Sequence, residues 1–291
     1  MKISTEINSI AQFVGMEEAV RMVADSGFDG WDFTLNVLAP YDWGRGVILP
    51  SDHPLCGEGY LEYSARLGEI GRENGIVCNQ AHSPFPVYVP AIRAKTVRAL
   101  ECVAAAGGHL CVVHPINDAS ARENAEYYAE FLPAAKKLGV TIACENMYNW
   151  DNAAGHAAFA ACGTPESFVE HIDLVGDPSL VACLDIGHAE MMSWCGVSAV
   201  GMVKALGGKR LKALHIHDND RIGDKHQIPF SMNIDFPPVV KALKEIGYDG
   251  YFTLESSSYL RACSKDDIKG GVKKMAQAAR RLADMFESAN A

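Results

Sequence analysis

The chain lacks the features that mark several broad classes of protein. It has no run of about 18 apolar residues, so we expect no membrane-spanning helix and no membrane partner. Its first residues, Met-Lys-Ile-Ser-Thr-Glu, contain no apolar signal segment, which favours a cytoplasmic location. It has no cluster of Lys or Arg, and 36 acidic residues outnumber 26 basic ones, for a net charge of −10. Because such a charge repels polyanions, we expect no nucleic-acid partner.

Paired cysteine motifs are also missing. The nine cysteines are odd in number, scattered, and form no Cys-x-x-Cys pair. Several lie inside apolar, strand-like stretches, namely Cys78, Cys111, Cys144 and Cys183. This pattern favours reduced, buried thiols over a disulfide framework or a structural zinc site.

Short apolar runs alternate with longer amphipathic segments along the whole chain. The eight runs predicted to be strands lie near 2–8, 28–33, 76–82, 109–114, 140–145, 180–185, 211–217 and 251–255. The eight segments predicted to be helices lie near 16–26, 58–75, 90–107, 120–139, 164–175, 197–207, 236–247 and 265–288. No Gly-x-Gly-x-x-Gly follows the first strand, which weighs against an open dinucleotide-binding sheet. The pattern predicts an α/β fold, a (β/α)₈ TIM barrel with a parallel eight-stranded barrel and outer helices, as one domain over 1–291.

Acidic or imidazole side chains stand at the ends of six consecutive predicted strands. They are His82, His114, Glu145, Asp185 with His188, His215 with His217, and Glu255. Each one alone could be a structural residue or a helix cap. In a barrel, however, the carboxyl ends of the strands converge, and carboxylates forced together repel each other unless a cation neutralises them. The joint pattern therefore predicts a metal site.

The strongest set of metal ligands combines three carboxylates with one imidazole: Glu145, Asp185, His215 and Glu255. Such a set suits a borderline-hard ion, so Mn²⁺ is the first choice, with Mg²⁺, Co²⁺ or Zn²⁺ as alternatives. His215 and His217 are two residues apart and face the same way in a strand. One of them is expected to bind the metal and the other to support it or pack.

The long segment between the second strand and the second helix, 35–59, is rich in Pro, Gly and aromatic residues and is expected to be an active-site loop. Within it, Trp43, His53 and Cys56 either shape the pocket or form a packed lid. Tyr148 and Trp150, which follow Glu145, either stack on a sugar ring or simply pack.

Ordered motifs carry a resemblance to a known superfamily. They are Gly27-Phe28-Asp29-Gly30-Trp31-Asp32, Ala81-His82-Ser83-Pro84, Glu145-Asn146, Asp185-Ile186-Gly187-His188, His215-Ile216-His217-Asp218, Asp224-Lys225-His226 and Leu254-Glu255. In this order they resemble the xylose-isomerase-like TIM barrels, which include sugar phosphate isomerases, ketose 3-epimerases and endonuclease-IV-type AP endonucleases. The resemblance implies that Glu145, Asp185, His215 and Glu255 bind the metal.

The resemblance also implies residues that contact the substrate. Asp151, His188 and Arg221 match substrate-binding positions of the ketose 3-epimerases, although that family usually has Glu where this chain has Asp151. His82, His114, Asp224 and His226 match additional metal ligands of the repair nucleases. Many sugar enzymes of the superfamily also keep these residues, so they do not decide between a nuclease and a sugar enzyme. For a sugar enzyme, we expect His82, His114 and His226 to bind the substrate.

These residues support proton transfer beside a carbonyl. A metal that holds the carbonyl oxygen would stabilise an enediolate, and Glu145 and Glu255 would act as the catalytic carboxylates on its two faces. We therefore expect a metal-dependent sugar isomerase or epimerase. The alternative is a lyase or dehydratase acting on a keto-sugar, keto-inositol or keto-glycoside, and an AP endonuclease ranks below both. The expected partner is a small carbohydrate without phosphate, while a homo-oligomer or a partner subunit is left open.

Overall fold

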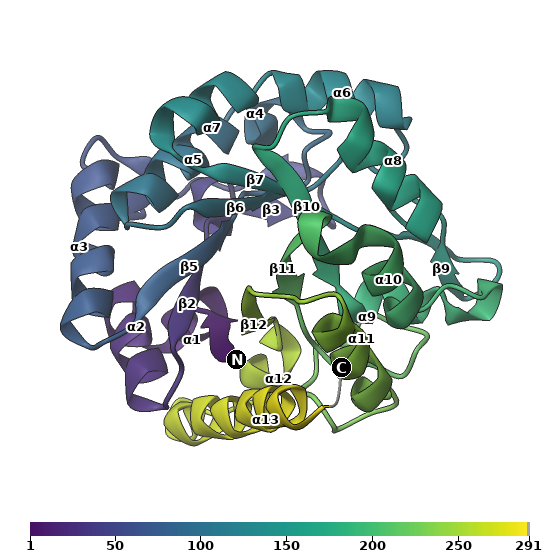
Figure 1. Cartoon of the computed structure of the whole chain (residues 1–291). Coiled ribbons are helices and arrows are strands. Elements are labelled where there is room, and N and C mark those ends of the chain that lie inside the picture. Colours follow the sequence, from purple (N-terminus) through teal and green to yellow (C-terminus); the bar gives the residue numbers. More distant parts are fainter. Residues whose placement is uncertain (290–291) are drawn as a thin grey trace.

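Eight apolar runs form the parallel strands that the sequence predicts. The computed structural model describes residues 1–289 (Figure 1). The barrel strands are β1 (Lys2–Glu6), β2 (Gly30–Thr34), β5 (Val77–His82), β6 (Leu110–Val113), β7 (Thr141–Glu145), β10 (Leu180–Asp185), β11 (Leu211–His215) and β12 (Tyr251–Leu254). Their order in the sheet is β11-β10-β7-β6-β5-β2-β1-β12. Neighbouring strands in the chain are therefore also neighbours in the sheet, except for β11 and β12, which lie at its two edges.

The barrel closes between β11 and β12. The amide of Ile216 donates to the carbonyl of Thr253 (2.9 Å), and the amide of Glu255 donates to the carbonyl of Ile216 (3.0 Å). These bonds pair the two outer strands of the sheet in parallel. The predicted (β/α)₈ TIM barrel is confirmed.

Helices surround the barrel and follow the strands in alternation. They are α1 (Asn8–Val14), α2 (Met16–Asp25), α3 (Tyr60–Glu73), α4 (Pro90–Arg93), α5 (Thr96–Ala105), α6 (Ala121–Ala129), α7 (Leu132–Leu138), α8 (Pro165–Val175), α9 (Ile186–Met191), α10 (Ala199–Arg210), α11 (Phe236–Glu245), α12 (Ser257–Arg261) and α13 (Ile268–Ser288). Two predicted helices are each divided in two, at 94–95 and at 130–131. Pro133 explains the second division, because proline has no N–H for a continuous helix and is tolerated in the first turn of a new one.

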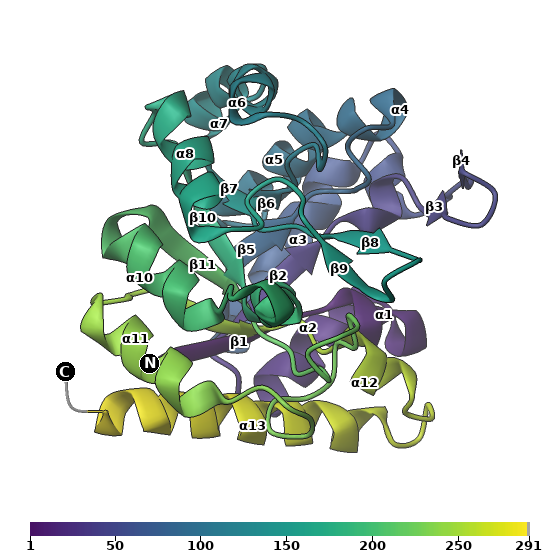
Figure 2. The same cartoon turned by 90° about the vertical axis from the view of Figure 1, so that its right-hand side faces the viewer.

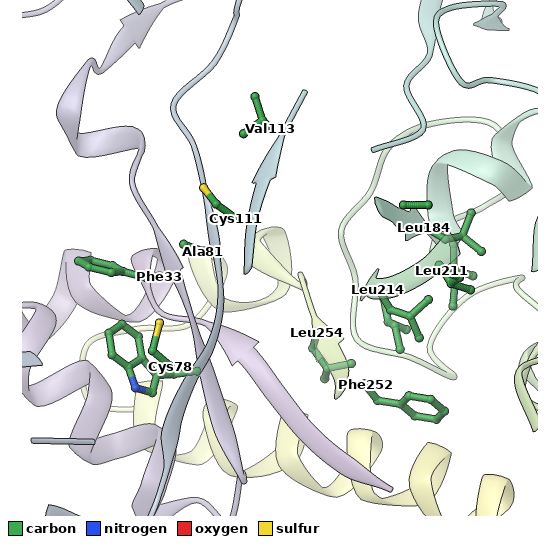
Figure 3. Packing of buried hydrophobic residues seen from close by; sticks show 14 of the residues in the cluster. Phe33, Cys78, Ala81, Cys111, Val113, Leu184, Leu211, Leu214, Phe252 and Leu254 are labelled. Carbon is green, nitrogen blue, oxygen red and sulfur yellow. The ribbon is translucent and has the colours of Figure 1, made fainter. Parts of the chain in front are cut away.

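Side chains of the strands pack in two layers. Leu184 and Leu214 belong to the main core between strands and helices (Figure 3). Alternate residues form a separate small cluster made of Val112, Ala143, Val181, Cys183 and Ala213. Because side chains alternate across a strand, this second cluster faces the barrel interior.

Two antiparallel hairpins stand at one end of the barrel. They are formed by β3 (Tyr41–Asp42) with β4 (Val47–Ile48), and by β8 (Asn149–Asp151) with β9 (His156–Ala158). Figure 2 shows both on the side opposite the C-terminus. The first hairpin lies in the predicted active-site loop and is followed by a short 3₁₀ turn, Pro54–Cys56. Both hairpins therefore flank the carboxyl ends of the strands.

All nine cysteines are free thiols, and six of them are buried. Within residues 1–289, no helix is long and apolar enough to cross a membrane.

Candidate metal centre

Strand alternation aims the predicted ligands into the barrel. Glu145 is two residues beyond Ala143, Asp185 is two beyond Cys183, and His215 is two beyond Ala213. The three small residues belong to the interior cluster, so the three longer side chains continue on the same face at the strand ends. Glu255 follows β12 by one residue, and its side chain is 21% exposed. The interior of the barrel thus ends in a layer of carboxylate and imidazole groups.

These four predicted ligands, called here the four-ligand group, lie close together. One ligand atom from each of Glu145, Asp185, His215 and Glu255 lies within 4.8 Å of all the others. The Nδ1 atom of His215 is 2.8 Å from Oε1 of Glu145 and 3.6 Å from Oε2 of Glu255. One divalent ion could therefore contact all four residues without a change of backbone.

A second cluster, called the histidine group, lies beside the first. It contains His188, His217, Asp224 and His226, again with ligand atoms within 4.8 Å of one another. His217 Nε2 is 3.2 Å from Oδ1 of Asp185, which places the two clusters in contact. His215 and His217, two residues apart, thus belong to different clusters, and the assignment of one of them as the metal ligand stays a prediction. His82 forms a third combination with Glu145 and His215.

Backbone carbonyls orient the histidines. Three of them donate Nδ1–H to a carbonyl oxygen: His82 to Ser83 (2.8 Å), His188 to Asn146 (2.9 Å) and His226 to Glu255 (2.7 Å). The other ring nitrogen, Nε2, is then free to accept a proton or a metal and lies among the carboxylates. His114 Nε2 is 3.0 Å from His82 Nε2 and 3.1 Å from Oε2 of Glu145. Fixed tautomers of this kind are usual around protein-bound metals.

Several buried atoms at the clusters have no hydrogen-bond partner among the described residues. They are Oε2 of Glu145, Oδ2 of Asp185, Nε2 of His215, Nε2 of His217 and Oδ1 of Asp224. Leaving a buried polar group without a partner costs about 1–3 kcal/mol, and more for a charged group. A divalent cation bound by the four-ligand group would satisfy the oxygens of Glu145 and Asp185, whereas the atoms of His217 and Asp224 belong to the histidine group. The residues present therefore fit a metal ion.

The pKa values of the histidines also indicate a site that attracts positive charge. Burial opposes the charged form of His215, yet the acidic groups around it, Cys183 and Glu145 first, raise its pKa well above the ordinary value. Burial likewise opposes the charge of His226, but Asp224 raises its pKa to about 9. The carboxylates thus create a site that draws positive charge, which a proton or a metal ion can supply.

Asp32 is a residue of the site that the sequence pattern did not single out as functional. It is 1% exposed, accepts a hydrogen bond from Nε2 of Gln80 (2.9 Å), and its Oδ2 lies 3.5 Å from Nε2 of His215. Nδ1 of His215 therefore faces the four-ligand group, and the Asp32 carboxylate lies near the opposite nitrogen without a hydrogen bond to it. The sequence did contain a signal for Asp32, because it is a carboxylate within an apolar strand with no basic residue beside it.

A cavity of about 470 Å³ opens over the clusters. Its lining comes from several loops at the carboxyl ends of the strands: Trp43, His82, Phe85, Pro86, Val87, Tyr88, His114, Pro115, Ile116, Asn117, Asp118, Glu145, Met147, Tyr148, Asn149, His188, Asp224, His226 and Glu255. Both predicted catalytic carboxylates and four of the predicted substrate-binding histidines are therefore at the cavity wall. None of these lining residues is Lys or Arg.

Two predicted substrate contacts lie away from the cavity wall. Asp151 is exposed on the hairpin of β8, where its Oδ1 accepts hydrogen bonds from the amides of Ala153 (2.8 Å) and Ala154 (3.0 Å). Arg221 pairs with Glu190 at 3.3 Å, and neither of these two residues lines the cavity. Their roles in substrate binding stay predictions. His53 and Cys56 are also absent from the lining, whereas Trp43 is part of it.

Comparisons with known proteins place this geometry in context. Residues 20–287 match the family described as xylose isomerase-like TIM barrel. An uncharacterized protein of Methanocaldococcus jannaschii is 30% identical over 273 residues, covering 87% of this chain and 83% of that protein. Among solved structures, a D-tagatose 3-epimerase-like protein has a TM-score of 0.72 at 22% identity, covering 99% of this chain and 98% of that one. The IolI protein, solved with a zinc atom, has a TM-score of 0.70 at 17% identity, covering 100% of both chains.

Proposed function

Because the chain belongs to the xylose isomerase-like TIM barrel family, as its strand-end motifs predict, we propose that it is a divalent-metal-dependent sugar isomerase or epimerase. The observation that carries this proposal is the convergence of the four-ligand group, of which Glu145 and Glu255 line a cavity of about 470 Å³. The orphaned oxygen atoms of Glu145 and Asp185 in that group support a bound ion. The similarity in fold to a D-tagatose 3-epimerase-like protein supports a sugar substrate.

The four-ligand group would hold the ion, with Mn²⁺ as the first choice. A divalent ion there would act as a Lewis acid and stabilise negative charge on a carbonyl oxygen. The zinc atom in the IolI structure supports a metal in this fold without identifying the ion used here.

Two carboxylates are available for proton transfer. Glu145 ends β7 and Glu255 follows β12, strands that are not neighbours in the barrel. Both line the cavity, so each can approach a substrate from its own direction. If one removes the proton beside the carbonyl and the other returns it on the opposite face, the centre is inverted. If the same group returns it to the adjacent carbon, the product is an isomer.

Other wall residues can hold hydroxyl groups. His188, His226 and Tyr148 line the cavity, and the hydroxyl of Tyr148 donates to Oδ2 of Asp224 at 3.1 Å. The imidazole Nε2 of His188 faces inward because its Nδ1 is fixed by the carbonyl of Asn146. These groups would orient a polyol above the carboxylates, and their fixed positions lower the entropic cost of a reactive pose.

The direct test is conversion of a panel of substrates by protein loaded with Mn²⁺. Unphosphorylated ketohexoses, keto-inositols and keto-glycosides would be incubated with the protein and the products separated by chromatography and mass. We expect a product of unchanged mass, an epimer or an aldose. A product lighter by one water would instead establish a dehydratase. No conversion of any member of the panel would contradict the proposal.

A further inference from the structure

A series of aromatic rings leads from the candidate metal centre to the mouth of the cavity. The ring of Phe85 stacks on that of His114, with centroids 4.6 Å apart and planes inclined by 28°. The next ring outward, Trp43, lies 6.3 Å from Phe85, and Tyr41 packs edge-on against Trp43 at 5.1 Å. The aromatic surface is therefore continuous from a residue that touches Glu145 to the tip of the first hairpin.

The outer rings of this series are unusually open. Trp43 and Tyr88 both line the cavity, yet each is 62% exposed. Large aromatic rings left uncovered on the wall of a concave site indicate a surface that a ligand covers. Trp150, on the other hairpin, is 43% exposed but does not line the cavity. Both tryptophans are therefore exposed, but only Trp43 lies on the wall of the cavity.

Polar groups complete this outer part of the cavity. Asn117, Asp118 and Asn149 line it together with Trp43 and Tyr88. Amide and carboxylate groups can exchange hydrogen bonds with sugar hydroxyls, while an aromatic ring covers the apolar C–H face of a sugar ring. This combination of surfaces suits a carbohydrate ring rather than a purely apolar group.

We propose that Trp43, Phe85 and Tyr88 form a subsite for a second ring of the substrate, so that the natural substrate is a keto-disaccharide or keto-glycoside without phosphate. This proposal rests on the proposed function, because the reacting ring must lie over Glu145 and Glu255. The cavity volume of about 470 Å³ falls in the range of roughly 300–1,000 Å³ that encloses drug-sized ligands. One small ketose would leave the outer part of such a cavity to water.

The charges on the wall disfavour a phosphorylated substrate. Four carboxylates line the cavity, those of Asp118, Glu145, Asp224 and Glu255, and no Lys or Arg does. A phosphate group would meet repulsion from these carboxylates and would find no Lys or Arg to form charge-assisted hydrogen bonds with it. The second ring is therefore expected to be neutral.

Equilibrium binding tests the subsite without requiring turnover. Calorimetry on protein loaded with Mn²⁺ would compare D-glucose, cellobiose and D-glucose 6-phosphate as one-ring, two-ring and phosphorylated probes. We expect cellobiose to bind most tightly and the phosphate most weakly. In Trp43→Ala we expect about a tenfold loss of cellobiose affinity, the value of one aromatic contact, with glucose affinity within about twofold. Trp43→Phe should restore most of the loss, and the control Trp150→Ala should change neither.

Each outcome decides the proposal. Equal binding of glucose and cellobiose, or an equal loss for both in Trp43→Ala, would overturn it. Unchanged binding together with an altered sedimentation coefficient in Trp43→Ala would also overturn it, since the hairpin would then be a protein interface. Selective cellobiose binding with no conversion of any sugar would keep the subsite and refute the proposed function. Conversion of ketohexoses without selective cellobiose binding would support the proposed function and refute the subsite.

Discussion

Asp32 shows how a single residue outside the four-ligand group can govern it. Its carboxylate lies 3.5 Å from Nε2 of His215, and both side chains are almost fully buried. A carboxylate behind a metal-binding imidazole fixes the ring orientation and raises its basicity. Because it is itself held by Gln80 at 2.9 Å, Asp32 does not depend on solvent for its position.

We predict that Asp32→Ala weakens Mn²⁺ binding by about 10- to 100-fold, the usual effect of removing such a partner. Asp32→Asn, which keeps the shape and one oxygen acceptor, should lose less. Isothermal titration calorimetry measures both, and Asp25→Ala, which alters an exposed carboxylate paired with Lys269, provides the control. An affinity for Mn²⁺ that is unchanged in Asp32→Ala would rule out this role.

At the start of the short helix α9, Asp185 has one role that the sequence predicts and a second role that only the structure shows. Asp185 was predicted as a strand-end ligand, and the structure also makes it the N-cap of α9, with its Oδ1 accepting from the amide of His188 at 2.7 Å. Its other oxygen, Oδ2, remains available to the four-ligand group. One carboxylate therefore joins the end of β10 to the start of α9 and fixes where His188 lies.

We predict that Asp185→Asn abolishes tight Mn²⁺ binding while the chain keeps a cooperative thermal transition. Asparagine retains the cap, since both residues are favoured N-caps. Asp185→Ala should lose the metal and also about 1 kcal/mol of stability through the lost cap. Circular dichroism with elemental analysis separates these effects, and a non-cooperative transition in Asp185→Asn would contradict them.

The limits of sequence-based prediction also appear at this scale. Period-two alternation places Glu145, Asp185 and His215 on the inward face of their strands, so their convergence followed from the barrel itself. The position of Asp151 did not follow, because it depends on the β8–β9 hairpin that its own side chain helps to form. The contact between Asp32 and His215 joins residues 183 positions apart (215 − 32), and nothing local in either strand indicates it.

For the whole molecule, the clusters couple metal binding to pH. Acidic neighbours raise the pKa of His215 well above its ordinary value and that of His226 to about 9, so the metal-free protein favours the protonated form of both imidazoles. A metal ligand must be neutral imidazole, so a metal ion and protons compete. Affinity should therefore rise as the pH increases from 6 to 9 and fall as it decreases.

We predict that Mn²⁺ binding releases protons at pH 7 and saturates at about one equivalent in the four-ligand group. Calorimetry in buffers of different ionisation enthalpy counts the protons. Two or three equivalents would show that the histidine group and His82 also bind ions. A Mn²⁺ affinity that does not change between pH 6 and 9 would contradict the raised pKa of His215.

The central claim is that Glu145 and Glu255 move a proton beside a carbonyl, and exchange with D₂O measures that step itself. Protein loaded with Mn²⁺ would be incubated in D₂O with each ketohexose and keto-glycoside of the panel, and deuterium would be located by NMR. We predict incorporation at the carbon next to the carbonyl. Glu145→Gln and Glu255→Gln should each abolish inversion, while one of them keeps exchange at the face served by the remaining carboxylate. No incorporation into any substrate by the metal-loaded protein would contradict the account.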